Sequence, residues 1–195
     1  MEMNRDQVNL LVNQVQRSHR LLAGFYKRIL PSFDEIAEKF GGTFGSWDPI
    51  DFERPSRSGT KPSRKWTWDY LPLMNAKFMY IRADSAQPAI FEFHLHTEPA
   101  VLKPNRKGSG QPDPLKLEEM TPNVRVYLYW LKDGAGTDVQ AHWEKAEFPE
   151  GDSLSISTLT ESLEGTWWDV QLVDFIASPE LICEMINRFV SYPSS

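Results

Sequence analysis

The first thirty residues place apolar side chains at intervals of three and four positions. Because an α-helix has 3.6 residues per turn, these side chains fall on one face, and the pattern predicts a long amphipathic helix whose stripe is buried. Asp6 is the expected N-cap, and Pro31 is expected to end the helix because it removes a backbone donor. The stripe consists of Val8, Leu11, Val12, Val15, Leu22, Tyr26, Ile29 and Leu30.

A second, short helix is predicted directly after Pro31. Residues 32–35 (Ser-Phe-Asp-Glu) fit a capping box, in which side chains at both ends accept hydrogen bonds from the first backbone amides. The two glycines at 41–42 are expected to end this helix. Its buried face would consist of Ile36, Ala37 and Phe40.

From Thr43 onward, aromatic and β-branched residues dominate and turn residues recur, which is typical of strands. Short connections favour an antiparallel, meander-like sheet, because parallel pairs need longer crossovers. The segment 133–136 indicates a hairpin turn between the fifth and sixth strands. We predict about six to seven strands, over residues 43–47, 65–70, 77–82, 89–98, 123–132, 138–147 and 165–175.

The C-terminal region predicts a closing helix. Ser178 and Pro179 form a typical helix start, with proline at the first helical position. The apolar stripe of this helix consists of Leu181, Ile182, Met185, Ile186 and Phe189. The whole pattern therefore predicts one α+β domain over residues 1–195, in which a long N-terminal helix and a C-terminal helix pack on the antiparallel sheet.

Composition narrows the class of protein. Hydrophobic residues make up 41% of the chain, which favours a folded core. The single cysteine, Cys183, excludes an intramolecular disulfide framework and a multi-cysteine zinc site. The chain begins with polar residues, and no apolar run approaches the roughly 18 residues of a membrane helix. We expect a soluble, cytoplasmic protein that does not bind membranes.

The formal net charge of −6 is divided unevenly along the sequence. Residues 117–195 contain four basic and fourteen acidic side chains, so they carry −10 and residues 1–116 carry +4. Such a division can mark two surfaces with different partners, although charges from both halves also intermix on folding.

The strand predicted over residues 89–98 contains a candidate metal site. Because side chains alternate across a strand, Glu92, His94, His96 and Glu98 would share one face. Two imidazoles spaced in this way can converge on one divalent metal ion, with Glu98 as a third ligand. The alternative interpretation is an ordinary half-buried strand whose polar face lies in water.

Two segments rich in basic residues are candidate anion-binding loops. They are residues 53–65 and 102–116, and lysine and arginine are the usual phosphate ligands. Trp66, Trp68 and Tyr70 would share a strand face after the first loop, where they could stack on bases. The acidic pI of about 5.3 argues against nucleic acid. The candidate anion-binding residues are Arg54, Arg57, Lys61, Arg64, Lys103, Arg106 and Lys107.

Acidic and aromatic residues suggest a protein-binding surface. Tryptophan is enriched among residues that dominate binding energy, and the chain contains seven. The rings of Trp167 and Trp168 must point to opposite faces of a strand, so one of them is expected to leave the main core. The candidate partner-binding residues are Trp143, Glu144, Glu147, Glu150, Trp167 and Trp168.

Motifs for enzymatic chemistry are absent from the sequence: it has no G-x-S-x-G elbow and no phosphate-binding loop. We therefore expect a non-enzymatic protein-binding or inhibitor-type protein, comparable to immunity proteins or phage inhibitors, that needs no cofactor and binds a basic protein. One alternative is a metal-dependent enzyme centred on His94 and His96. Another is a ligand-binding or nucleic-acid-binding domain that uses the basic loops.

Overall fold

The computed structural model describes residues 4–55, 57–83, 86–106, 108–132, 136 and 138–191. Its strands form one antiparallel sheet in the order β1-β2-β3-β4-β6-β5, so the protein is α+β, as predicted. Neighbours in sequence pair in space from β1 to β4, and each of these pairs is antiparallel. The strands are β1 (Thr43–Pro49), β2 (Asn75–Arg82), β3 (Ala89–His96), β4 (Asn123–Leu131), β5 (Ser157–Thr158) and β6 (Leu163–Gln171).

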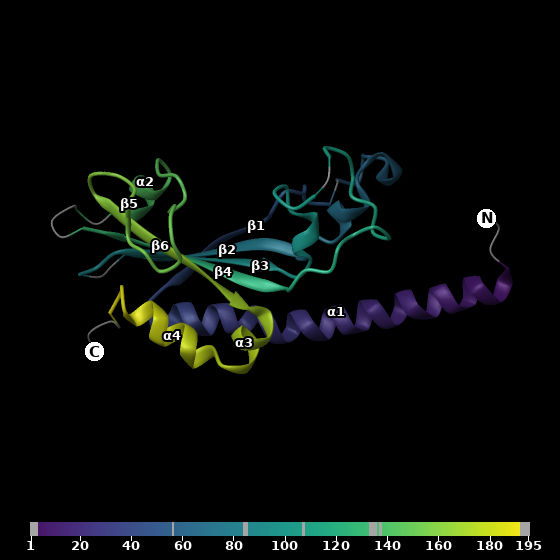
Figure 1. Ribbon diagram of the computed structural model, residues 1–195, viewed down its shortest axis with the longest axis horizontal. Helices are drawn as coiled ribbons and strands as arrows, with labels where there is room; N and C mark the ends of the chain where they lie inside the picture. The colour runs from purple at the N-terminus through teal and green to yellow at the C-terminus, as the bar shows by residue number, and fades with distance from the viewer. Residues whose placement is uncertain are drawn as a thin grey trace.

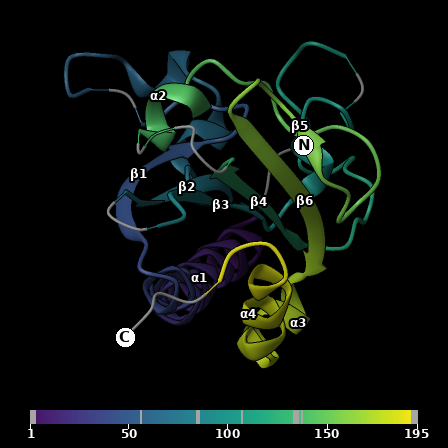
Figure 2. The same ribbon diagram turned by 90° about the vertical axis from the view of Figure 1, so that its left-hand side faces the viewer.

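The helices divide between the two faces of the sheet. One face is covered by α1 (Arg5–Lys39), α3 (Leu172–Ala177) and α4 (Pro179–Asn187), which lie side by side beneath it (Figure 1 and Figure 2). The other face carries α2 (Val139–Trp143) at one end and the long β1–β2 and β3–β4 connections at the other. We call these the helix face and the α2 face. None of the helices that the structure describes is both long and apolar enough to cross a membrane.

Helix α1 is continuous over 35 residues, so the predicted break at Pro31 is wrong. Asn4, and not Asp6, is the N-cap: its side chain accepts the Gln7 backbone amide, and the Gln7 side chain accepts that of Asn4. Pro31 removes only one backbone hydrogen bond, whereas apolar packing on both sides of it holds the same helical face on the sheet. The predicted second helix is therefore the last part of α1.

The core lies between the sheet and the C-terminal part of α1. Phe33 is fully buried, and its ring centroid lies 4.9 Å from that of Phe78, 5.3 Å from that of Phe93 and 5.1 Å from that of Phe175. These partners belong to β2, β3 and α3, so the side chain of Phe33 joins α1 and α3 to two neighbouring strands of the sheet. The predicted closing helix is α4, which buries Ile182 and Ile186 against this core.

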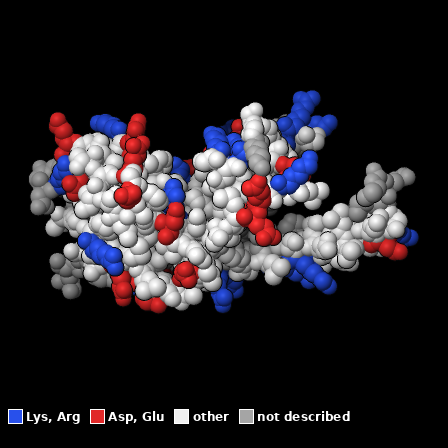
Figure 3. Space-filling model, viewed as in Figure 1, with Lys and Arg blue, Asp and Glu red and all other residues white. Residues whose placement is uncertain are grey.

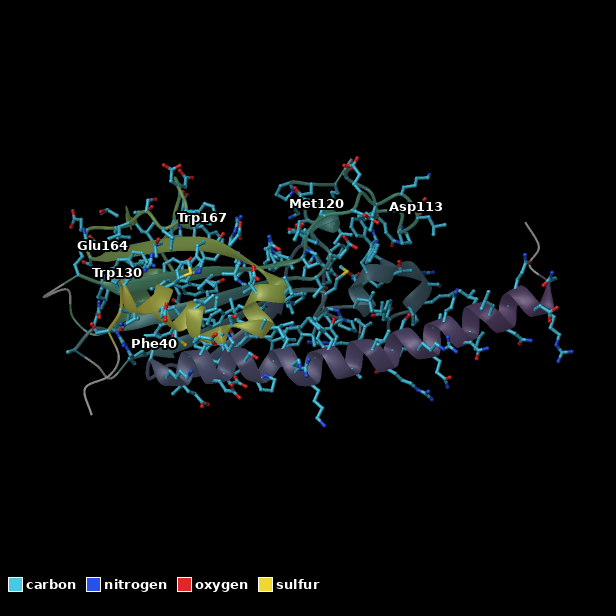
Figure 4. All side chains as sticks on the ribbon, turned by 60° about the horizontal axis from the view of Figure 1, so that its bottom comes forward. Phe40, Asp113, Met120, Trp130, Glu164 and Trp167 are labelled. Atoms are coloured by element: carbon cyan, nitrogen blue, oxygen red, sulfur yellow. The ribbon has the colours of Figure 1, made fainter. Side chains whose placement is uncertain are left out.

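The N-terminal part of α1 extends past the sheet (Figure 1), and nearly all of its side chains are exposed to solvent (Figure 4). We call residues 5–24 the arm. The predicted burial of the apolar stripe is correct from Ile29 onward but wrong in the arm, where Val8, Val12 and Val15 are exposed. The helical period shows which side chains share a face, but it carries no information about where the sheet ends.

Two predicted strands are not strands. Residues 65–70 follow one short 3₁₀ turn, Pro62–Arg64, and contain a second, Thr67–Tyr70. Trp68 is buried against the β3–β4 connection, where its Nε1–H donates to the Pro112 carbonyl over 2.9 Å. The shared face expected for Trp66, Trp68 and Tyr70 therefore does not exist. Residues 138–147 contain α2, because the Asp138 side chain caps a helix by accepting the Ala141 amide over 3.0 Å.

Two further boundaries differ from the predictions. The last predicted strand, 165–175, is divided into β6 and α3, which begins directly after Gln171. A third 3₁₀ turn, Pro99–Val101, follows β3. Most of the hairpin predicted over 133–136 lies outside the described residues.

Candidate functional site

The polar side chains of β3 are buried on the α2 face. Glu92 is 0% exposed, His94 8% and His96 7%, so the expectation that this face lies in water is wrong. Phe148, from the segment after α2, accounts for part of this burial: its ring lies 5.8 Å from that of His94 and 4.8 Å from that of Tyr127. The central strand is therefore enclosed on both sides, and its polar residues form an interior cluster.

Glu92 and His94 form a pair within this cluster. Their Oε1 and Nε2 atoms are 2.7 Å apart, and the cross-strand neighbour of Glu92 is Tyr127, whose ring stacks edge-on to His94 at 4.8 Å. The second carboxylate oxygen of Glu92, Oε2, is buried and has no hydrogen-bond partner among the described residues. A buried carboxyl oxygen without a hydrogen-bond partner is costly in an apolar interior.

His96 is engaged by a different residue. Its Nδ1 lies 2.8 Å from Oδ1 of Asn123, and its ring centroid is 6.1 Å from that of His94. Burial lowers the pKa of His96 to about 4, a change that the Asn123 contact opposes and the neighbouring His94 reinforces. His96 is therefore neutral at physiological pH.

The metal hypothesis receives no geometric support. Within the described residues, no group of three or more His, Cys, Asp or Glu side chains is arranged to hold a metal ion. Glu98 follows the end of β3, and its backbone takes part in hydrogen bonds with the Asn75 side chain. A metal at His94 and His96 remains a prediction.

An ion pair lies next to this cluster on the same face. Arg125 donates two hydrogen bonds to Asp169, over 2.8 and 2.7 Å, and its guanidinium lies 4.4 Å from the centre of the Trp167 ring. The hydrogen bond to Asp169 raises the pKa of Arg125. Trp168 points to the helix face and is buried in the core, so the two rings separate as predicted and only Trp167 is accessible to a partner.

A cavity of about 230 Å³ opens beside α2. Tyr129 and Trp143 meet there edge to face, with ring centroids 6.5 Å apart, and burial raises the pKa of Tyr129, an effect that the Glu92 carboxylate reinforces. We call this cavity the α2 pocket. It is lined by Tyr129, Trp143, Glu144, Ala146, Glu147 and Phe148.

The structure brings together part of the predicted partner-binding set. Trp143, Glu144 and Glu147 line the α2 pocket, whereas Glu150 is exposed outside it. Tyr129 and Phe148 were not predicted, although the alternation of aromatic residues in 123–131 indicates that Tyr127 and Tyr129 share a strand face. Phe148 carries no such signal, because it lies in an irregular segment.

The basic loops lie at the opposite end of the α2 face, where Lys and Arg side chains gather at the upper right (Figure 3). Several of these cations have acidic neighbours: Arg54 bonds Asp48 over 2.8 Å, and Lys103 lies 3.7 Å from Asp51. Arg106 lies over the Trp66 ring at 5.5 Å. Arg57, Lys61 and Arg64 are exposed, and Lys107 lies outside the described residues. Anion binding here remains a prediction.

Carboxylates also enter the cavity between these loops. It measures about 500 Å³ and is lined by Asp51, Glu53 and Asp69 as well as by basic and aromatic side chains. The Lys65 ammonium pairs with Glu53. This mixture of charges is poorly suited to a polyanion, which requires a surface that is positive over its whole length.

Comparison of the chain with known proteins assigns it to a family. No curated protein matches the chain, and no solved structure does. A family model described as PM0109 matches residues 5–187, which is nearly the whole chain and includes the arm, the sheet and α4. The chain belongs to the PM0109 family.

Proposed function

We propose that this chain is a protein-binding domain that recognises a basic segment of its partner through the α2 pocket. The observation that carries this proposal is the lining of the pocket, in which the rings of Tyr129, Trp143 and Phe148 lie together with the carboxylates of Glu144 and Glu147. The ligand group is a cationic side chain of the partner, a lysine or an arginine.

The chemistry of the lining favours such a group. The face of an aromatic ring carries partial negative charge, so a cation held over it is attracted by about 0.5–2 kcal/mol. The exposed carboxylates of Glu144 and Glu147 add attraction at the rim. A cation in the pocket therefore meets both aromatic rings and carboxylates.

The surrounding surface supports association with a basic protein. Glu150 is exposed outside the pocket, and residues 117–195 carry a net charge of −10. Charges of this kind accelerate encounter with an oppositely charged partner more than they slow dissociation. This is the mode of action expected of a non-enzymatic inhibitor or immunity-type protein that covers a basic site on its target.

The proposal is tested with a lysine-rich peptide as the probe, measured by calorimetry and by the rate of association. We expect the double reversal Glu144→Lys and Glu147→Lys to weaken binding at least tenfold, and Trp143→Ala to weaken it about fivefold, since one cation–π contact contributes about 1 kcal/mol. Raising the salt concentration is expected to slow association, because exposed charges are screened within about 8 Å at physiological ionic strength.

The matched control is Glu161→Lys, which reverses an exposed charge that does not line the pocket. This variant is expected to bind the peptide almost as the parent does. Equal binding by the parent and by the Glu144→Lys, Glu147→Lys variant would show that the pocket is not the site.

A further inference from the structure

A largely apolar cavity lies between α1 and the first two strands, on the helix face of the sheet. Its volume of about 430 Å³ falls within the usual range for small-molecule sites, roughly 300–1,000 Å³. The α2 pocket lies on the other face of the sheet, so the two sites are separate. The cavity is lined by Leu30, Asp34, Phe44, Trp47, Leu73, Phe78 and Tyr80.

Aromatic rings form most of the wall of this cavity. Phe44 and Tyr80 meet edge to face, with ring centroids 5.6 Å apart. Phe44 is 54% exposed, so the rest of the described chain leaves much of this side chain uncovered. Aromatic surface gathered around an open cavity is typical of a binding site, and four rings favour a ligand that itself has an aromatic body.

The polar part of the wall is acidic. Asp34 accepts a hydrogen bond from the Tyr80 hydroxyl over 2.7 Å, and none of the described residues that line the cavity is basic. Within the described part of the chain, neither Asp34 nor Glu38, one turn later, forms an ion pair. Burial raises the pKa of Tyr80, and the hydrogen bond to Asp34 and the charges of Asp34 and Glu38 raise it further. The ligand group that complements this wall is a cation.

The surroundings of the cavity favour a small molecule over a macromolecule. A partner helix about 10 Å in diameter occupies roughly 800 Å³ for each 10 Å of its length, about twice the volume of the cavity. A partner strand would have to pair with the outer edge of β1. There the Trp47 carbonyl already accepts a hydrogen bond from Arg54 over 2.5 Å, and Pro49 has no N–H to donate. Arg54 is itself bound to Asp48 over 2.8 Å and does not line the cavity.

We propose that this cavity binds a small aromatic amine. The ring of the ligand lies among the four aromatic side chains, and its ammonium group donates to the carboxylate of Asp34. Because charge-assisted hydrogen bonds are roughly twice as strong as neutral ones, Asp34 sets the preference for an amine, whereas the rings supply apolar contact. This site goes beyond the function proposed for the α2 pocket and does not depend on it.

Three indoles that carry different end groups on the same two-carbon chain test the proposal: tryptamine with an amine, tryptophol with a hydroxyl and indole-3-propionate with a carboxylate. Titrations of the full chain followed by NMR give the dissociation constants. We expect tryptamine to bind at least about tenfold more tightly than tryptophol, and indole-3-propionate to bind most weakly because Asp34 repels it. The indole N–H signal of Trp47 should shift on binding. Shifts confined to Trp143 would place the amine in the α2 pocket and overturn the proposal.

Substitution of Asp34 separates the charge from the apolar contact. Asp34→Asn keeps an acceptor for the Tyr80 hydroxyl but removes the carboxylate, so it is expected to weaken tryptamine binding at least about tenfold and to leave tryptophol binding unchanged. The matched control is Glu35→Gln, which removes the same charge from the next residue; Glu35 is exposed and does not line the cavity. This control should bind tryptamine as the parent does. Undetectable binding of tryptamine by the parent, or equal dissociation constants for the parent and Asp34→Asn, would contradict the assignment of the site.

Discussion

Replacing Phe33 with alanine is expected to lower the free energy of unfolding by about 3–5 kcal/mol, the usual range for a fully buried aromatic residue. The Phe33 ring contacts Phe78, Phe93 and Phe175 at centroid distances of 4.9, 5.3 and 5.1 Å. Alanine would leave a cavity where α1, α3 and the sheet meet, and three fixed aromatic neighbours cannot all move in to fill it. Urea denaturation followed by circular dichroism measures the change.

The control for this experiment lies on the same helix. Leu21 is 74% exposed in the arm, so Leu21→Ala is expected to change the unfolding free energy by no more than about 0.5 kcal/mol. Equal effects of the two substitutions would contradict the assignment of the sheet contact to the second half of α1. A change below about 1 kcal/mol for Phe33→Ala would show that the helix is not docked in this way.

The fold was predictable to the extent that local periodicity encodes it. Alternating aromatic and β-branched residues located β1 to β4, and the 3.6-residue period located α1 and α4. The failures at 65–70 and 138–147 have a common cause. There, aromatic residues that favour strands pack on neighbouring loops, and the Asp138 cap starts a helix, so tertiary contacts and a single side chain outweigh local propensity.

The arm and the site were less predictable for a different reason. A helical stripe predicts burial, but the sequence cannot state whether the covering surface belongs to the same chain or to another one. The charge of residues 117–195 drew attention to Glu144 and Glu147 next to Trp143, and the structure places these three in one pocket, which is also lined by Tyr129 from β4 and Phe148 from a loop. Only the folded arrangement brings these segments together.

The burial of β3 was not predictable from its alternation. Alternating polar residues such as Glu92, His94 and His96 normally indicate a solvated face, and here that face is covered by residues far away in sequence, including Phe148. This covering removes the His96 imidazole from water, so protonation of His96 would place a charge in the interior.

The consequence is a loss of stability in mild acid that depends on His96. Its pKa is lowered from 6.5 in the unfolded chain to about 4 in the folded protein, chiefly by burial. Between these values the unfolded chain binds a proton that the folded protein does not, so the free energy of unfolding falls as the pH decreases from 6.5 to 4. Since one pKa unit corresponds to 1.36 kcal/mol, this one residue accounts for a loss of about 3 kcal/mol.

The contribution of His96 is separated from that of the acidic groups by comparing variants. In His96→Gln, an amide that does not titrate replaces the imidazole beside Asn123. The difference in the free energy of unfolding between variant and parent should therefore change by about 3 kcal/mol between pH 6.5 and pH 4. His19→Gln, in the exposed arm, should leave the pH profile unchanged. NMR titration gives an independent measurement, because the His96 Cε1 proton should keep its neutral chemical shift down to about pH 5. An imidazole that titrates near 6.5 would mean that water reaches the α2 face of β3, and the enclosed cluster described above would then be wrong.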